Sequence, residues 1–164
     1  MSDKRQKEFE TLLQANRAIV FKTTNTYCWR PEDRDDLAQE IAAQLWRAWP
    51  SYDASRTFTT WMYRIALNVA ISFVRREVQH RKVFTPFEED LHEAMPQPPT
   101  DPDAADRMVR LQRFIASEPP FERSLLLLYL EEKSQKEIAE ILGITATNVS
   151  TKISRLKQRI RTEI

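Results

Sequence analysis

The stretch "TFTTWMYRIALNVAISFVRR", residues Thr57 to Arg76, decides the fold, because its apolar residues recur at helical spacing over several turns. A row at every fourth residue, with two small or flexible neighbours, predicts a buried seam: Trp61, Ile65, Val69 and Phe73, flanked by Met62 and Ala66. A second row projects another way: Arg64, Asn68, Ile71 and Arg75. The helix is therefore either an ordinary core helix whose polar face is exposed to solvent, or a helix whose polar face binds nucleic acid.

The composition predicts an all-helical chain. Of 164 residues, 41% are apolar and 30% are charged, which is usual for a globular protein. The single glycine, Gly143, nearly excludes tight hairpins and glycine-rich phosphate loops. The single cysteine, Cys28, excludes an internal disulfide and is expected to be a small buried residue.

Nothing in the sequence predicts a metal, a cofactor, a small-molecule substrate or an enzyme. His80 and His92 have no zinc-ligand spacing, and the carboxylates around Asp36 and Glu40 lack partner histidines. The N-terminal "MSDKRQKEFETLLQ" has no long apolar run, so we expect neither a signal peptide nor a membrane span, and a cytoplasmic protein.

Apolar periodicity predicts three helices in the first half of the chain. One spans Phe9 to Val20, one follows Pro31 with a stripe of Leu37, Ile41 and Leu45, and the third is the opening stretch. In the second half, four segments read as helices: "ADRMVRLQRFIAS", "PPFERSLLLLYLEE", "SQKEIAEIL" and "GITATNVSTKISRLKQRIR".

The segment from Thr85 to Asp106 is expected to be an extended linker. It contains seven acidic residues, no Lys or Arg, and five prolines, which disfavour helix. On composition alone, the segment reads either as a solvated tether or as an acidic functional element.

The last two predicted helices form a helix-turn-helix candidate. Ser134 and Glu137 have the spacing of a capping box, Gly143 supplies the turn, and Thr145 or Thr147 caps the second helix. Val149, Ile153, Leu156 and Ile160 form its buried stripe, and the remaining residues are small and polar first, then basic. Hydroxyls, amides and cations suit base edges and phosphates, so we favour DNA binding over a merely solvated face.

Basic and aromatic residues are also interleaved before the linker, a combination that suits unpaired bases. Between Arg64 and Lys82 the cations outnumber the single acid, Glu77. Trp61 is expected in the core. For Tyr52 and Tyr63, a core position and a contact with nucleic acid are both open interpretations.

Two stretches resemble a known family. "DLAQEIAAQLWRAWPSYDASRTFTTWMYRIALNVAISFVRR" is similar to region 2 of the bacterial sigma-70 family, in its small extracytoplasmic-function (ECF) branch. "ERSLLLLYLEEKSQKEIAEILGITATNVSTKISRLKQRIR" is similar to region 4 of the same family. The resemblance implies two small helical domains, residues 1–84 and 107–164, joined by the linker 85–106.

The resemblance also implies partners and site residues. Core RNA polymerase would bind Asp36, Gln39, Glu40 and Gln44. The −10 promoter element would be bound by Tyr52, Ser55, Arg56, Tyr63, Arg64, Asn68, Ile71, Arg75 and Arg76. The −35 element would be bound by Thr145, Thr147, Asn148, Ser150, Thr151, Lys152, Ser154 and Arg155.

In this family the linker passes near the polymerase active centre, where its acidity would mimic nucleic acid, and an anti-sigma protein commonly covers the polymerase-binding surfaces. A rival interpretation is a stand-alone helix-turn-helix regulator, which would bind a palindromic site as a dimer without polymerase. That interpretation leaves the polymerase-docking pattern and the acidic linker unexplained.

Overall fold

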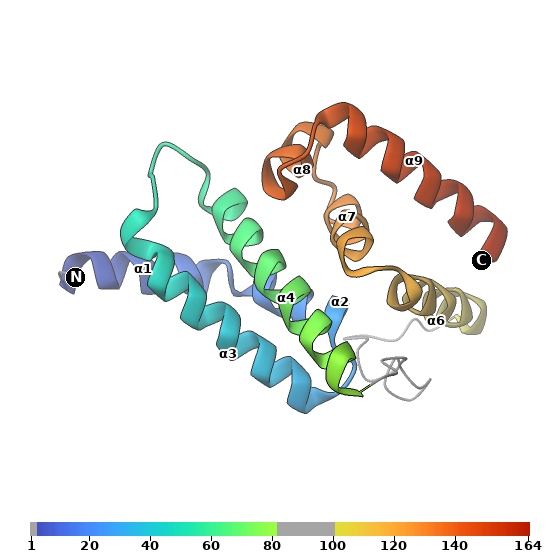
Figure 1. The fold of residues 1–164 in the computed structure, drawn as a ribbon, viewed down its shortest axis with the longest axis horizontal. Helices are drawn as coiled ribbons and strands as arrows, with labels where there is room; N and C mark the ends of the chain where they lie inside the picture. The colour runs from blue at the N-terminus through green and yellow to red at the C-terminus, as the bar shows by residue number, and fades with distance from the viewer. Residues whose placement is uncertain (1–2, 82–100) are drawn as a thin grey trace.

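The computed structural model describes residues 3–81 and 101–164, which are helical with short connections and contain no strand within those ranges. The N-terminal module consists of α1 (Asp3–Ala15), α2 (Arg17–Tyr27), α3 (Pro31–Ala48), the short helix η1 (Trp49–Ser51) and α4 (Phe58–Arg81). The C-terminal module consists of α6 (Pro102–Ser117), α7 (Pro120–Leu130), α8 (Gln135–Leu142) and α9 (Ala146–Glu163). The predicted all-α fold is confirmed (Figure 1).

The first predicted helix is in fact two helices, divided at Asn16. The side-chain amide of Asn16 donates a hydrogen bond to the Leu12 carbonyl at 2.8 Å, and its backbone leaves helical geometry with a ψ of 20°. Asparagine side chains compete for backbone hydrogen bonds in this way, which explains why the chain bends here.

Helix α3 follows the sequence prediction closely. Pro31 occupies its first turn together with the acidic residues Glu32 and Asp33, which suits a helix N-terminus. Leu37, Ile41 and Leu45 are all fully buried against the rest of the module. The Trp49–Pro50–Ser51 turn ends the helix and leads into the loop before α4.

The buried face of α4 is displaced from the predicted seam. Its buried side chains include Met62, Tyr63, Ala66, Leu67, Ala70, Phe73 and Val74. Trp61, Ile65 and Val69 are only half-buried. A row of every fourth residue rotates about 40° per step around a helix of 3.6 residues per turn, so it cannot stay on one face for four turns.

Helix α6 begins earlier than expected. The Asp101 side chain accepts a hydrogen bond from the backbone N–H of Asp103 at 3.0 Å, and Pro102 occupies the first turn. The last five residues of the expected linker are therefore helical, because this cap and this proline suit a helix start. Residues 85–100 of the linker lie outside the described residues.

Helices α8 and α9 form the predicted helix-turn-helix. The Ser134 hydroxyl and the Glu137 carboxylate make both hydrogen bonds of a capping box. Gly143 adopts the left-handed conformation with φ 71°, and the Thr145 hydroxyl, rather than that of Thr147, caps α9. These local features fix the angle at which α9 leaves the turn.

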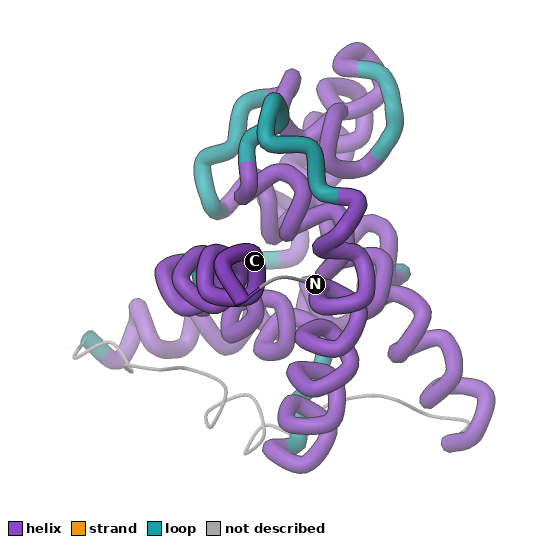
Figure 2. Tube along the Cα trace, turned by 90° about the vertical axis from the view of Figure 1, so that its left-hand side faces the viewer, coloured by secondary structure: helices purple, strands orange, loops and turns teal. Residues whose placement is uncertain are grey.

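The two modules pack against each other. Helices α7 and α8 contact α2 and α4, and the buried apolar residues of both modules form one continuous cluster. Figure 1 shows α6–α9 along one side of α4, with α3 on the other side, and Figure 2 shows the same helices turned by 90°. Cys28 is fully buried, as expected, and burial raises the pKa of its thiol to about 12.

Candidate functional site

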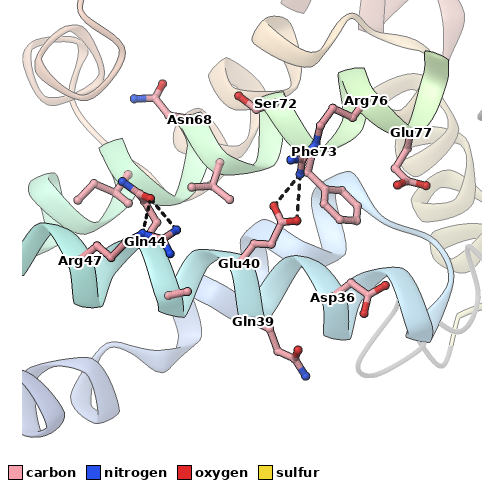
Figure 3. Close-up of a pocket in the computed structure, with 13 residues that line it drawn as sticks. Asp36, Gln39, Glu40, Gln44, Arg47, Asn68, Ser72, Phe73, Arg76 and Glu77 are labelled. Atoms are coloured by element: carbon pink, nitrogen blue, oxygen red, sulfur yellow. Dashed lines mark hydrogen bonds and ion pairs between the residues drawn. The ribbon is translucent and has the colours of Figure 1, made fainter. Parts of the chain in front are cut away.

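A groove of about 970 Å³ runs between α3 and α4 (Figure 3). The α3 wall carries Asp36, Gln39, Glu40 and Gln44, which are the residues predicted to bind polymerase. The α4 wall carries two residues predicted to bind DNA, Asn68 and Arg76, together with the apolar Ile65, Val69 and Phe73. The structure therefore brings parts of two separately predicted sites to the same groove.

An ion pair crosses this groove. Arg76 Nη2 lies 2.7 and 3.0 Å from the two carboxylate oxygens of Glu40, and both side chains are substantially exposed. Gln44 in turn accepts hydrogen bonds at 3.0 and 3.3 Å from the guanidinium of Arg47 (Figure 3). Exposed pairs of this kind exchange readily for other partners, because they contribute little net free energy.

The outer face of α4 is polar and basic. Arg64, Asn68, Arg75 and Arg76 are exposed, as the sequence pattern predicts, and the apolar Ile71 among them is half-buried. The cations of this face could neutralise phosphates, and the Asn68 amide could bond a base edge.

Tyr63 lies on the opposite face and is not available to DNA in this conformation. Its side chain is 3% exposed, and Lys133 Nζ, from the turn between α7 and α8, lies 5.6 Å from the ring centroid. Burial raises the pKa of its hydroxyl to about 12. The open question about Tyr63 is answered in favour of the core, and its assignment to the −10 surface is wrong for this conformation, because the ring is buried.

The loop before α4 is held by a cluster of aromatic side chains. Trp49 lies at its centre, stacked on Tyr52 at 5.2 Å and in contact with Phe9, Phe58 and Trp61. Phe9 comes from α1, so local spacing could not reveal its part in the cluster.

Within that loop, the Tyr52 hydroxyl donates to the Arg56 carbonyl at 2.9 Å, and the Ser55 N–H donates to Asp53 Oδ1 at 2.9 Å. The bond from Ser55 lowers the pKa of the Asp53 carboxyl. Ser55 and Arg56 are exposed and Tyr52 is half-buried, so this fixed loop presents polar groups beside an aromatic ring.

Helix α9 presents the predicted DNA-binding residues on its outer side. Val149, Ile153 and Leu156 are buried, whereas the following are exposed: Thr145, Thr147, Asn148, Ser150, Thr151, Ser154 and Arg155. Lys152 is half-buried with its ammonium 5.7 Å from the Phe121 ring. Because α9 is the second helix of a helix-turn-helix, its first turns are the part that enters a major groove in this motif.

The more distal Arg159 has a structural partner. Its guanidinium makes two hydrogen bonds to the buried carboxylate of Glu118, one of them at 3.0 Å. This pair ties α9 to the end of α6, so Arg159 belongs to the packing of the module rather than to the DNA-binding face.

Residues 3–81 and 101–164 contain no group of three or more His, Cys, Asp and Glu side chains placed to hold a metal ion. Over the same ranges, no helix is long and apolar enough to cross a membrane.

Two family models match the chain. The model described as "Sigma-70 region 2" matches residues 12–79, and the model described as "Sigma-70, region 4" matches residues 108–160. The two matches together cover most of the chain and fall on the N-terminal and C-terminal modules respectively.

Two proteins with similar sequences are RNA polymerase sigma factors. The ECF RNA polymerase sigma factor SigW of Bacillus subtilis (strain 168) is 28% identical, over 97% of this chain and 90% of its own length. The RNA polymerase sigma-E factor of Streptomyces coelicolor is 26% identical, over 96% of this chain and 86% of its own length.

Solved structures share the fold. CnrH, in complex with the cytosolic domain of CnrY, aligns with a TM-score of 0.68 over 96% of this chain and 87% of its own, at 19% identity. RpoE, in complex with the anti-sigma factor NepR from Bartonella quintana, aligns with a TM-score of 0.73 over 95% of this chain and 96% of its own, also at 19% identity.

The predicted resemblance is thus confirmed, and the rival interpretation as a stand-alone regulator is set aside. The family is non-enzymatic, and it directs RNA polymerase to promoters. The chain belongs to the sigma-70 family, as an ECF sigma factor built from regions 2 and 4.

Proposed function

We propose that this sigma factor binds polymerase and the two promoter elements through three separate surfaces, each defined by particular residues. The groove between α3 and α4 binds core RNA polymerase through Asp36, Gln39, Glu40 and Gln44. The α4 face and the preceding loop bind the −10 element, and α9 binds the −35 element. Tyr63 is left out of the −10 surface because it is buried.

The observation that carries the proposal is the division of α9 into two faces. Three apolar residues are buried, and seven of the eight residues proposed to contact the −35 element are exposed on the remaining surface. A helix whose outer face only met solvent would need no particular order of polar residues. In α9, hydroxyls and an amide come first and cations follow them. This order suits base edges near the helix start and phosphates beyond it.

The −10 surface consists of Tyr52, Ser55, Arg56, Arg64, Asn68, Ile71, Arg75 and Arg76. Its support is the juxtaposition of a fixed polar loop, the half-buried Tyr52 ring and an exposed basic helix face. A ring and nearby cations are suited to a base that has left the duplex, since stacking contributes about 1–3 kcal/mol per base.

The polymerase surface would require the ion pair between Arg76 and Glu40 to exchange partners. Both side chains are exposed, so the exchange costs little. We infer that the protein acts in the cytoplasm, where polymerase and promoter DNA are found. An N-terminal domain of residues 1–84 and a C-terminal domain that begins with α6, rather than at residue 107, belong to the same proposal, with the acidic linker as an element near the polymerase active centre.

We also propose an anti-sigma partner for this chain. The support is the likeness to CnrH and RpoE, both solved in complex with CnrY and NepR respectively. Such a partner would have to cover the groove between α3 and α4 or the outer face of α9 to prevent initiation.

The −35 assignment is tested with Arg155→Ala. If Arg155 contacts a base, binding of a matched −35 duplex weakens by about 1–3 kcal/mol and the preference at one base pair relaxes. A smaller loss that is uniform across sequences, with a shallower salt dependence, would make Arg155 a phosphate contact. Gln158→Ala, an exposed position on the same helix that is absent from the proposed set, is the control.

The polymerase assignment is tested with Gln39→Ala and Glu40→Ala together. We expect a weaker complex with purified core polymerase and an unchanged circular dichroism spectrum. Binding as tight as that of the natural chain would remove the groove from the proposal.

A further inference from the structure

Helix α9 carries two lysines whose ammonium groups lie over aromatic rings of α7. Lys152 Nζ is 5.7 Å from the centroid of the Phe121 ring, and Lys157 Nζ is 5.4 Å from that of Tyr129. Phe121 is the second residue of α7 and Tyr129 is the last but one, so the rings lie at the two ends of a helix that packs against α9. Each lysine is half-buried and has a defined place on the module before any ligand binds.

The two lysines lie on opposite flanks of α9. At about 100° per residue, Lys152 and Lys157 project about 70° to either side of the buried stripe of Val149, Ile153 and Leu156. A helix in the major groove, which is about 12 Å wide, faces base edges along its outer side and a phosphate backbone along each flank. The two flank positions therefore suit phosphates that belong to opposite strands of the duplex.

An aromatic partner leaves each ammonium able to bind an anion. A ring attracts a cation through its quadrupole and carries no formal charge, whereas a carboxylate would neutralise the cation and would have to be displaced by DNA. Within residues 3–81 and 101–164, no carboxylate forms an ion pair with Lys152 or Lys157. The positive charge of both lysines is therefore available at the flanks of α9.

Arg159, on the same helix, provides the contrast. Its guanidinium carbon lies 5.3 Å from the centroid of the Phe114 ring, but its two terminal nitrogens also donate hydrogen bonds to the buried carboxylate of Glu118. The charge of Arg159 is therefore neutralised inside the module. A ring contact alone does not do this, which separates the two lysines from Arg159 although all three cations lie over rings.

We propose that Phe121 and Tyr129 are positioning residues for DNA binding: they hold Lys152 and Lys157 at the flanks of α9, where the two ammonium groups bind phosphates on opposite strands of the −35 duplex. The proposal rests on the proposed −35 surface and adds Lys157 and both rings to it. Without its ring, a lysine would adopt the binding position as one rotamer among several, and the apparent affinity would fall with the fraction of molecules in that rotamer. The rings thus increase the affinity without touching DNA.

The first experiment removes the ring of Tyr129, which is 39% exposed and so can be replaced without disturbing the core. The probe is a fluorescein-labelled duplex that the natural chain selects from a randomised library, and binding is measured by anisotropy at several NaCl concentrations. Tyr129→Leu should weaken binding about two- to fivefold, which corresponds to the loss of one exposed cation–π contact. Tyr129→Phe keeps the ring and should bind like the natural chain. Leu130→Ala, which shortens an exposed apolar neighbour without a ring, is the control and should have no effect.

The second experiment asks whether the ring acts through its lysine. Lys157→Gln should lower the slope of log K against log salt by about 1, because one phosphate contact is lost, whereas Tyr129→Leu keeps the charge and should leave the slope unchanged. In the Lys157→Gln background, Tyr129→Leu should have no further effect on affinity. Lys7→Gln removes the same charge from an exposed position of the N-terminal module and is the control.

The third experiment tests the assignment to opposite strands. Phosphates of the probe are replaced by uncharged methylphosphonates on one strand at a time. Neutralising one strand should abolish the effect of Lys157→Gln, and neutralising the other should abolish that of Lys152→Gln. If both lysines lose their effect with the same strand, the opposite-strand arrangement is overturned.

Nuclear magnetic resonance of the free chain with ¹³C-labelled lysine completes the test, because a ring shifts the signals of a methylene group held above it upfield. The Cε protons of Lys157 should be shifted in the natural chain and in Tyr129→Phe, and not in Tyr129→Leu. Unshifted protons in the natural chain overturn the proposal, as does Tyr129→Leu binding as tightly as the natural chain or weakening binding equally in the Lys157→Gln background. If instead the library yields no preferred duplex, the proposed −35 surface fails and the phosphate contacts fail with it, while the shifts still report whether the ring holds the lysine.

Discussion

The two modules position their functional surfaces by different physical means. In the C-terminal module, neighbouring residues fix the geometry: a capping box at Ser134, a left-handed Gly143 and a cap at Thr145 all lie within twelve positions. In the N-terminal module, distant residues do so. The loop before α4 depends on Phe9 packing against Trp49, forty positions away, and the groove depends on α3 and α4 lying side by side.

This contrast predicts how far the effect of a substitution reaches in each module. A change in the C-terminal turn acts through backbone conformation, over one or two helical turns. A change in the N-terminal aromatic cluster acts through packing and reaches segments far apart in the sequence. Variants that separate these two effects therefore test the comparison, and four of them follow in order of expected effect.

The largest effect is expected from Trp49→Ala. The change removes a buried ring that contacts Phe9, Tyr52, Phe58 and Trp61, so the free energy of unfolding should fall by about 3–5 kcal/mol. Urea denaturation measures the loss. Binding of single-stranded −10 DNA should weaken as the loop loses its support, while binding of a −35 duplex should change little.

Trp46→Ala is the matched control, because this tryptophan lies on the preceding turn, is 39% exposed and has an edge contact with Phe9. Its free energy of unfolding should fall clearly less than that of Trp49→Ala. Equal losses at the two positions would show that general hydrophobicity, rather than the cluster around Trp49, holds the loop.

The contrast between the modules also marks what the sequence could predict. The capping box, the turn glycine and the buried stripe of α9 were all predicted, because each depends on residues within one or two turns of each other. The assignment of Thr145 rather than Thr147 as the cap needed the structure, since both hydroxyls lie near the helix start.

Long-range packing accounts for what the sequence could not predict. Tyr63 is buried, and its ring contacts Lys133, which lies seventy positions later, so no local pattern contains that information. The same holds for the ion pair between Arg76 and Glu40, which connects two sites that the sequence pattern kept separate. The buried face of α4 was displaced for a different reason, namely the rotation of a four-residue row around the helix.

The second prediction concerns the C-terminal turn. Gly143→Ala should lower the free energy of unfolding by about 1–2 kcal/mol, because an alanine is strained at φ 71°. Nothing lies within 4 Å of the added Cβ, so the cost is one of backbone conformation alone. Gly143→Asn should cost less, since asparagine tolerates this region. A larger loss for Asn than for Ala would contradict the backbone account.

The third prediction concerns the start of α8. Ser134→Ala removes the acceptor for the Glu137 N–H and should cost about 1 kcal/mol, measured as a shift in the urea midpoint. Ser134→Thr keeps a hydroxyl and should restore most of the stability. A loss that Thr does not restore would indicate that the side chain acts by packing rather than as a cap.

The smallest effect on stability is expected at the groove of the N-terminal module. Arg76→Ala and Glu40→Ala remove an exposed ion pair, so a double-mutant cycle should give a coupling free energy of only about 0.2–1 kcal/mol. Raising the salt concentration should reduce that coupling, because exposed charges are screened. The Ser134 cap should respond much less to salt, since its hydrogen bond joins two neutral groups. A coupling above 2 kcal/mol that persists in high salt would show that the groove is held as rigidly as the C-terminal turn. The exchange of Arg76 for a polymerase cation would then become costly, and the proposed docking of polymerase at Glu40 would be contradicted.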